Sequence, residues 1–170
     1  FPAVSPYGKV PVLKHEGNTI YESAIINEYL EEVFPQIQLM PENHFERARA
    51  RIWIDYCSNY YLPACTQLMR DRNDPEEQEK NLENLGEIFL FMEHECFEKN
   101  NGGVFWMGKN ITVVDIHYAP VFECFGAYEN LCGAQWPDEC KNIRSWWSAM
   151  HERKSYQNTF LKEASTIETY

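Results

Sequence analysis

Two short motifs near the start of the chain could together hold an anionic ligand. The first is Val10-Pro11-Val12, which lies between two segments rich in turn residues, 5–8 and 16–18. Proline has no N–H to donate to a sheet, so Pro11 belongs at the start or edge of a strand, or beside a group that replaces the lost partner. A bound ligand is one such group, so this segment is a candidate binding strand.

The second motif is Glu22-Ser23, which directly precedes the aliphatic run Ala24-Ile25-Ile26. Serine is favoured where a helix begins, and the first N–H groups of a helix have no partner within it. Such a helix N-terminus attracts anions. Alone, each motif is typical of an ordinary edge strand or helix cap. In this order, and joined by one hairpin, the two motifs favour a ligand site.

These residues carry a specific resemblance to a known family. The run from Ser5 to Leu13, followed by residues 21–26, resembles the second half of the thioredoxin-like domain of soluble glutathione transferases. In that family the bond that corresponds to Val10–Pro11 is cis, which is an isomer largely restricted to proline.

The resemblance implies a glutathione site and gives each of its residues a role. The Val10 backbone, held beside Pro11, would pair with the cysteinyl backbone of glutathione, and Lys9 would neutralise one of its carboxylates. Glu22 and Ser23 would receive the γ-glutamyl end.

A second resemblance lies later in the chain. The segment from Gly108 through Thr112 and Asp115 to Pro120 is similar to the buried helix of the glutathione transferase C-terminal domain, and residues 143–155 are similar to a late helix of that domain. Compared with the family, the sequence given lacks the first strand, helix and strand, and with them the usual catalytic Tyr, Ser or Cys. We therefore expect no catalytic residue in this chain and little activity without an upstream segment.

The subclass is open at this point. Residues 6–13 and 22–30 look closest to omega-like and lambda-like members, which use a cysteine and support thiol transfer. A Tyr or Ser member would instead conjugate the glutathione thiolate to electrophiles.

The elements that position these motifs are mainly helices. We expect an α+β fold: a partial thioredoxin-like segment at residues 1–35, a proline-bounded linker, and an all-helical domain at 41–170. Apolar periodicity predicts a helix after residue 23, a long helix over 43–70 that Pro63 kinks, and a third with an apolar stripe from Leu82 to Cys96.

Aromatic and basic residues on the long helix are further candidates. Trp53, Tyr56 and Tyr60 recur at one-turn spacing and could line the second-substrate pocket, or equally pack between the domains. Three arginines precede them. A salt-bridged surface, with Arg51 paired to Asp55 one turn on, is favoured over contact with the anionic peptide. The arginines are Arg47, Arg49 and Arg51.

Thr112 and Asp115 form a capping-box pattern, with Ile111 and Ile116 at the two staple positions. This pattern fixes the start of a helix. For His117, a core histidine bonded to a backbone carbonyl is favoured over a ligand or acid–base role.

Composition excludes several classes of function. The chain has 170 residues, 44% of them hydrophobic, and a formal charge of −11, which argues against nucleic acid and anionic membranes as partners. No apolar run approaches membrane-spanning length. Six scattered cysteines indicate reduced thiols in the cytoplasm. The acidic run from Asp71 to Glu79 lacks calcium-loop spacing and is typical of a solvated helix start, so no metal site is expected.

The sequence therefore predicts a glutathione transferase-like enzyme that uses glutathione as co-substrate with a small electrophilic or disulfide substrate. We expect a cytoplasmic homodimer with a detoxifying role. The alternative is a non-catalytic interaction module, since glutathione transferase-like domains also serve in assembly.

Overall fold

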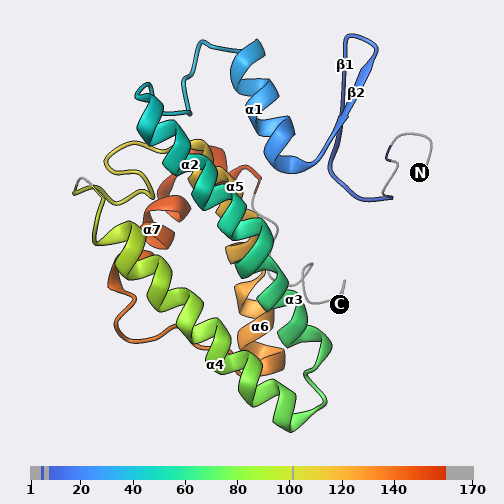
Figure 1. The fold of residues 1–170 in the computed structure, drawn as a ribbon, viewed down its shortest axis with the longest axis vertical. Coiled ribbons are helices and arrows are strands. Elements are labelled where there is room, and N and C mark those ends of the chain that lie inside the picture. Colours follow the sequence, from blue (N-terminus) through green and yellow to red (C-terminus); the bar gives the residue numbers. More distant parts are fainter. Residues whose placement is uncertain (1–4, 6–7, 101, 160–170) are drawn as a thin grey trace.

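A computed structural model describes residues 5, 8–100 and 102–159 of the chain. Pro6, part of the expected first turn, lies outside the described residues. A two-stranded hairpin and one helix stand at one side of a bundle formed by the remaining helices (Figure 1). The expected α+β class is confirmed.

The hairpin consists of β1 (Val12–His15) and β2 (Asn18–Tyr21), which pair antiparallel. Glu16 and Gly17 make the turn between them, and both have a positive φ, 49° and 79°. Glycine adopts this region freely, so it fits the tight connection. The strands lead into α1 (Ser23–Val33), which stops before Pro35 as expected.

The connection between α1 and the bundle is held by hydrogen bonds to Glu31. Its carboxylate accepts the N–H groups of Leu39 at 2.9 Å and Met40 at 2.8 Å. The Leu39 carbonyl in turn accepts the N–H of Val113 at 3.1 Å. These contacts fix α1 against the segment that precedes the bundle.

The predicted long helix is one run in three parts. It comprises α2 (His44–Tyr56), a π-helical turn η1 (Cys57–Tyr61) and α3 (Leu62–Arg70). Asn43 caps its start by accepting the N–H groups of Phe45 and Glu46. Pro63 lies just after the π-turn. A proline has no N–H to donate, so one backbone hydrogen bond of a continuous α-helix would be missing at this point. The predicted long helix is therefore interrupted by a π-helical turn just before the proline.

The next helix, α4 (Pro75–Met92), continues into a second π-turn, η2 (Glu93–Phe97). Asp74 caps α4, and Glu76 and Glu77 occupy its first turn, so the expected solvated acidic helix start is confirmed. Glu93 is 1% exposed, and its carboxylate accepts the backbone N–H groups at the start of α7 (Lys141–Glu152).

The remaining helices are α5 (Val113–Glu123), α6 (Phe125–Cys132) and the short α8 (Lys154–Gln157). Thr112 and Asp115 form the predicted capping box at the start of α5. The Asp115 carboxylate accepts the N–H of Thr112 at 2.7 Å, the N–H of Trp106 at 3.0 Å and the indole N–H of Trp146 at 2.8 Å. Burial raises the pKa of Asp115, and these hydrogen bonds act in the opposite direction.

Aromatic rings fill the core around this carboxylate. Trp106 stacks on Tyr118 with ring centroids 3.8 Å apart, and Trp146 meets Trp106 edge-on. The Tyr118 hydroxyl donates to the carbonyl of Trp53 at 2.9 Å, which joins α5 to α2. None of the helices in the described part of the chain has both the length and the apolar content to cross a bilayer.

Candidate functional site

The register of the hairpin brings the two N-terminal motifs together. Val12 pairs with Tyr21, so the next residues outward, Pro11 and Glu22, lie at the same end of the hairpin. The Val10–Pro11 bond is cis, as expected. Val10 is 75% exposed, which leaves its backbone open to a strand-like ligand. The two motifs that flank the hairpin in sequence therefore lie together at one end of it.

The start of α1 is open. Glu22 occupies the N-cap position with φ of 70°, and its side chain makes no capping hydrogen bond. Ser23 is the first helical residue, so a cap role for Ser23, the ordinary structural interpretation, is wrong. Residues other than glycine rarely adopt a positive φ, so the backbone of Glu22 is strained. Such strain often accompanies ligand sites. The first N–H groups of α1 are thus available to an anion.

Lys9 is exposed and lies next to this edge. Its backbone N–H donates to the Ser5 hydroxyl at 3.1 Å, and the Gly8 N–H donates to the Ser5 carbonyl at 2.9 Å. Gly8 has φ of 65°, which suits the turn that presents Lys9. The structure therefore places Lys9, Val10, Pro11, Glu22 and Ser23 at one end of the hairpin, and their glutathione-binding roles stay predictions.

The cysteines lie in the helical part of the chain, and most are buried. Burial raises the pKa of Cys65 to about 12 and raises the pKa values of Cys57 and Cys96 further. The pKa values of Cys132 and Cys140 are raised as well, chiefly by burial. A thiol must ionise to act as a nucleophile, so these five are poor candidates for catalysis.

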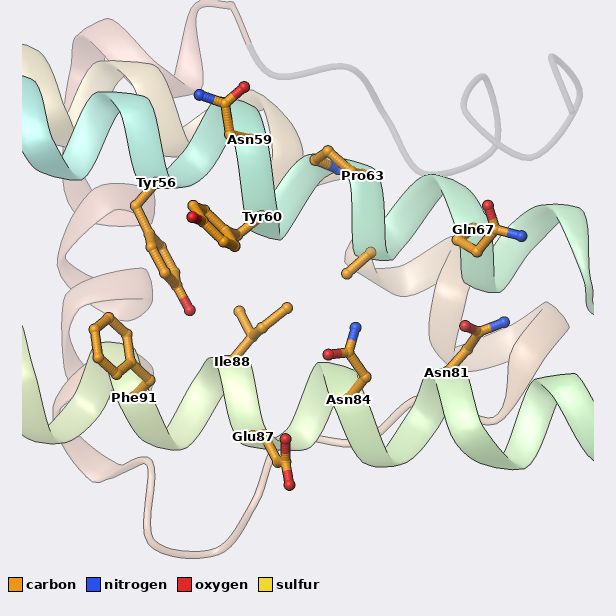
Figure 2. A pocket seen from close by; sticks show the side chains of 11 residues that line it. Tyr56, Asn59, Tyr60, Pro63, Gln67, Asn81, Asn84, Glu87, Ile88 and Phe91 are labelled. Carbon is orange, nitrogen blue, oxygen red and sulfur yellow. The ribbon is translucent and has the colours of Figure 1, made fainter.

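The three aromatic candidates on the long helical run differ in burial. Trp53 is 6% exposed and belongs to the core, which was the alternative interpretation. Tyr56 and Tyr60 stack with centroids 4.9 Å apart, and Tyr56 stacks on Phe91 of α4 at the same distance. Figure 2 shows Tyr56 pointing across to α4 with the Tyr60 ring beside it, and both rings line a groove of about 650 Å³.

That groove is lined by amide side chains as well as rings, including Asn81 and Asn84 from α4. Burial raises the pKa of Tyr56 to about 12, so its hydroxyl is protonated at neutral pH. Of the three residues expected to form the second-substrate wall, Tyr56 and Tyr60 line this groove and Trp53 does not. Their assignment to the second-substrate pocket stays a prediction.

The arginines have different partners from those expected. Arg51 makes a bidentate ion pair with Glu28 of α1, at 2.9 and 2.8 Å, and the expected pair with Asp55 is wrong. Asp55 instead accepts the Asn59 amide, and Arg49 pairs with Glu46. The ion pair with Arg51 lowers the pKa of Glu28, mainly through the hydrogen bond. For Arg49 and Arg51, the favoured salt-bridged interpretation holds.

His117 also differs from the expectation. Its Nε2 lies 3.1 Å from the hydroxyl of Ser58 in η1, so the expected bond to a backbone carbonyl is wrong. Burial lowers the pKa of His117, which favours the neutral imidazole. The sequence did not point to Ser58, although a proline five residues further on signals a helix irregularity nearby, and Ser58 lies within the π-turn.

Among the described residues, no three or more His, Cys, Asp or Glu side chains are grouped so that they could hold a metal ion. The residues near the open start of α1 are instead suited to an anionic peptide-like ligand, through N–H donors and one lysine.

Comparison with protein families gives two matches. "Glutathione S-transferase, N-terminal domain" matches residues 1–33, and "Glutathione S-transferase, C-terminal domain" matches residues 56–154. Glutathione S-transferase 3 of Glycine max is 30% identical over 94% of this chain, and glutathione S-transferase U25 of Arabidopsis thaliana is 30% identical over 86%. The chain covers 70% and 64% of the lengths of these two relatives.

Solved structures share the fold. The Tau class glutathione S-transferase from mango, Mangifera indica, superposes with a TM-score of 0.89 at 22% identity, covering 99% of this chain and 78% of that one. Glutathione transferase Omega 3C from Trametes versicolor superposes with a TM-score of 0.85 at 24% identity, covering 100% and 71%. Taken with the hairpin edge and the open start of α1, the matches to both domains show that this chain belongs to the glutathione S-transferase family.

Proposed function

We propose that this chain binds glutathione at the end of the hairpin and takes part in glutathione conjugation or glutathione-dependent thiol transfer. The observation that supports the proposal is the meeting of an exposed strand edge at Val10 with an uncapped helix start at Ser23. Glutathione is an extended anionic peptide. It can pair along the strand edge while its γ-glutamyl carboxylate meets the helix N–H groups.

Further support comes from the relatives, which are named glutathione S-transferases, and from a structurally similar rice protein described in complex with glutathione. Lys9 would add a charge-assisted contact to the second carboxylate. Glu22, beside Ser23, would meet the γ-glutamyl ammonium. A small electrophile or disulfide would be the second substrate.

Calorimetric titration of glutathione into the 170-residue chain tests the binding step. Lys9→Ala should weaken binding about three- to tenfold, as expected for the loss of one partly exposed charge-assisted hydrogen bond. Lys14→Ala is the matched control, because Lys14 is an exposed lysine on the same hairpin but away from the binding edge. Equal affinities for both variants and the parent chain would contradict the assignment of Lys9.

The second candidate is a non-catalytic interaction module, since glutathione transferase-like domains also serve in assembly. Because this chain is expected to lack the catalytic residue, turnover of 1-chloro-2,4-dinitrobenzene and of a glutathione mixed disulfide is measured on a version extended upstream. An extended version that binds glutathione and turns over neither substrate would support the interaction module.

We also propose that the protein forms a cytoplasmic homodimer with a role in detoxification. Two exposed apolar side chains on α2, Phe45 and Ile52, are 69% and 63% exposed and offer apolar area for association. Sedimentation of the chain over a range of concentrations tests the dimer, and a single monomeric species at all concentrations would contradict it.

A further inference from the structure

Glu31 is a half-buried carboxylate that the candidate glutathione site does not use directly. It lies in the second half of α1, two turns beyond the open start at Ser23. Its two oxygens accept the backbone N–H of Leu39 at 2.9 and 3.0 Å, and one of them also accepts the N–H of Met40 at 2.8 Å. Hydrogen bonds to a charged acceptor are stronger than those to a neutral one. Glu31 therefore ties α1 firmly to residues 39–40.

These two residues are themselves fixed to the bundle. Met40 is 2% exposed and belongs to the bundle core. The Leu39 carbonyl accepts the N–H of Val113, which is the first residue of α5 and is also buried. The hydrogen bonds of Glu31 thus set the position of α1 relative to the bundle itself.

Glu31 belongs to the side of α1 that faces the bundle. Ala24, Glu28 and Glu31 are spaced i, i+4, i+7, which places them on one helix face. Ala24 packs against the bundle core, and Glu28 pairs with Arg51 of α2. The Arg51 and Glu28 side chains are 49% and 29% exposed, and partly exposed ion pairs contribute little. Glu31 therefore makes the stronger polar contact on this face.

Another side of α1 holds the hairpin. The Tyr29 hydroxyl lies 2.8 Å from His15 Nδ1 at the end of β1. The Phe34 ring lies against the same imidazole, with ring centroids 5.7 Å apart. The hairpin and α1 stand together beside the bundle (Figure 1). Residues 8–34, which we call the glutathione module, therefore form one unit that carries the whole candidate edge.

The division into module and bundle separates two parts of a ligand. Glutathione itself would contact the module, whereas a group attached to its sulfur would extend beyond the module to the bundle. A gap of about 0.5–1 Å already removes a quarter to a half of the dispersion energy of a contact. The spacing between module and bundle therefore matters for the attached group and not for glutathione.

We propose that Glu31 is a positioning residue that sets this spacing, and so determines how well a substituent on the glutathione sulfur fits against the bundle. The inference deepens the proposed function and rests on glutathione binding by the module. Glu31 contacts no part of the ligand. It acts through Leu39 and Met40, which hold the module at a fixed distance from α5.

Calorimetric titration of glutathione and of S-hexylglutathione into the 170-residue chain tests the inference. Glu31→Ala should leave the glutathione Kd unchanged and lower the ratio of S-hexylglutathione affinity to glutathione affinity about tenfold. This factor corresponds to the lost burial of about two methylene groups of the hexyl chain. A role of Glu31 in stability alone would change neither affinity of the folded protein, so the ratio would stay the same.

Two conservative variants and one control sharpen the test. Glu31→Gln keeps a side-chain oxygen that can accept the N–H groups and should keep most of the ratio. Glu31→Asp keeps the charge on a shorter side chain and should lower the ratio, and it serves where Glu31→Ala does not fold. Glu32→Ala is the matched control, because Glu32 is an exposed glutamate on a different side of the same helix.

Amide hydrogen exchange gives a second readout that needs no ligand. Val113 does not contact Glu31 directly, but its N–H bonds to Leu39, which Glu31 holds. Exchange at Val113 should therefore become faster in Glu31→Ala, while the amides of β1 and β2 keep their rates. Thermal unfolding of each variant shows that these changes come from folded protein.

An unchanged affinity ratio in Glu31→Ala and Glu31→Asp, with glutathione bound as tightly as by the parent chain, would overturn this inference and leave the proposed function standing. A parent chain that binds neither glutathione nor S-hexylglutathione would overturn the proposed function, and this inference with it.

Discussion

The helices α1 and α5 begin in opposite ways. The start of α5 is closed: Thr112 and Asp115 satisfy each other, and Asp115 also holds Trp106 and Trp146 in the core. The start of α1 is open: Glu22 has a positive φ and no side-chain cap. At the start of α5 the Asp115 side chain is buried, with 0% exposure, whereas Ser23 at the start of α1 is exposed.

The difference separates stability from binding. Every helix start has N–H groups that need a partner. At α5 the chain supplies that partner itself, so the groups contribute to folding. At α1 they are left to the solvent or to a ligand, so they contribute to affinity. Substitutions at the two starts should therefore affect different measurements.

The largest expected effect is that of Asp115→Ala. Removing this carboxylate leaves several buried donors without an acceptor, including the N–H of Trp106 and the indole of Trp146. Loss of a buried hydrogen-bond network costs about 3 kcal/mol or more of unfolding free energy. Chemical denaturation measures it, with the exposed Asp138→Ala as the control. A loss no larger than that of the control would contradict the central role of Asp115.

Thr112→Ala should have the next largest effect. It removes a hydroxyl that lies 2.8 Å from Asp115 Oδ2 and takes part in the capping box. Cap substitutions of this kind cost about 0.5–2 kcal/mol. Glutathione affinity of the folded protein should not change. If the fully folded Thr112→Ala variant bound glutathione more weakly than the parent chain, the two helix starts would not differ in the way described above.

Ser23→Ala should give the reverse result. The Ser23 side chain makes no cap, so the free energy of unfolding should change by less than about 0.5 kcal/mol. Glutathione affinity should fall about three- to tenfold, because one donor to the γ-glutamyl carboxylate is lost. Calorimetry and denaturation on the same sample measure both quantities. If Ser23→Ala lowered the stability but not the glutathione affinity, Ser23 would have a structural role like that of Thr112 and no binding role.

The smallest expected effect concerns the ion pair that joins the two regions. Arg51→Gln removes the partner of Glu28, and a partly exposed pair is worth about 0.2–1 kcal/mol. Because the pair lowers the pKa of folded Glu28, its contribution is present above the ordinary glutamate value of 4.5 and is lost as the pH falls through the folded pKa. Denaturation midpoints of Arg51→Gln and the parent chain should therefore converge on acidification, and a difference that persists at low pH would contradict this account.

Local patterns predicted the features that depend on neighbours in sequence. The capping box at Thr112, the end of α1 before Pro35 and the buried stripe that includes Leu85 and Phe89 all follow from residues within a few positions of one another. The cis bond at Pro11 followed from the family resemblance. These features need only propensity, periodicity and short motifs.

Predictions about partners distant in sequence were less successful. Arg51 had Asp55 one turn away, yet it pairs with Glu28, which is reachable only after α1 folds against α2. His117 was expected to bond a backbone carbonyl, and the π-turn before Pro63 instead presents the Ser58 hydroxyl to it. Trp53, Tyr56 and Tyr60 share a spacing, but burial divides them between the core and a groove.

The sequence by itself thus determined the end of α1 before Pro35, the capped start of α5, and which residues could form an anion-binding helix start, because caps, turns and apolar periods act over a few residues. Only the tertiary structure decided what each side chain contacts. The hairpin register brought Pro11 to Glu22, and the packing of α5 on the long helical run brought His117 to Ser58. Such contacts depend on the relative placement of whole elements, which is set by the summed burial of the core.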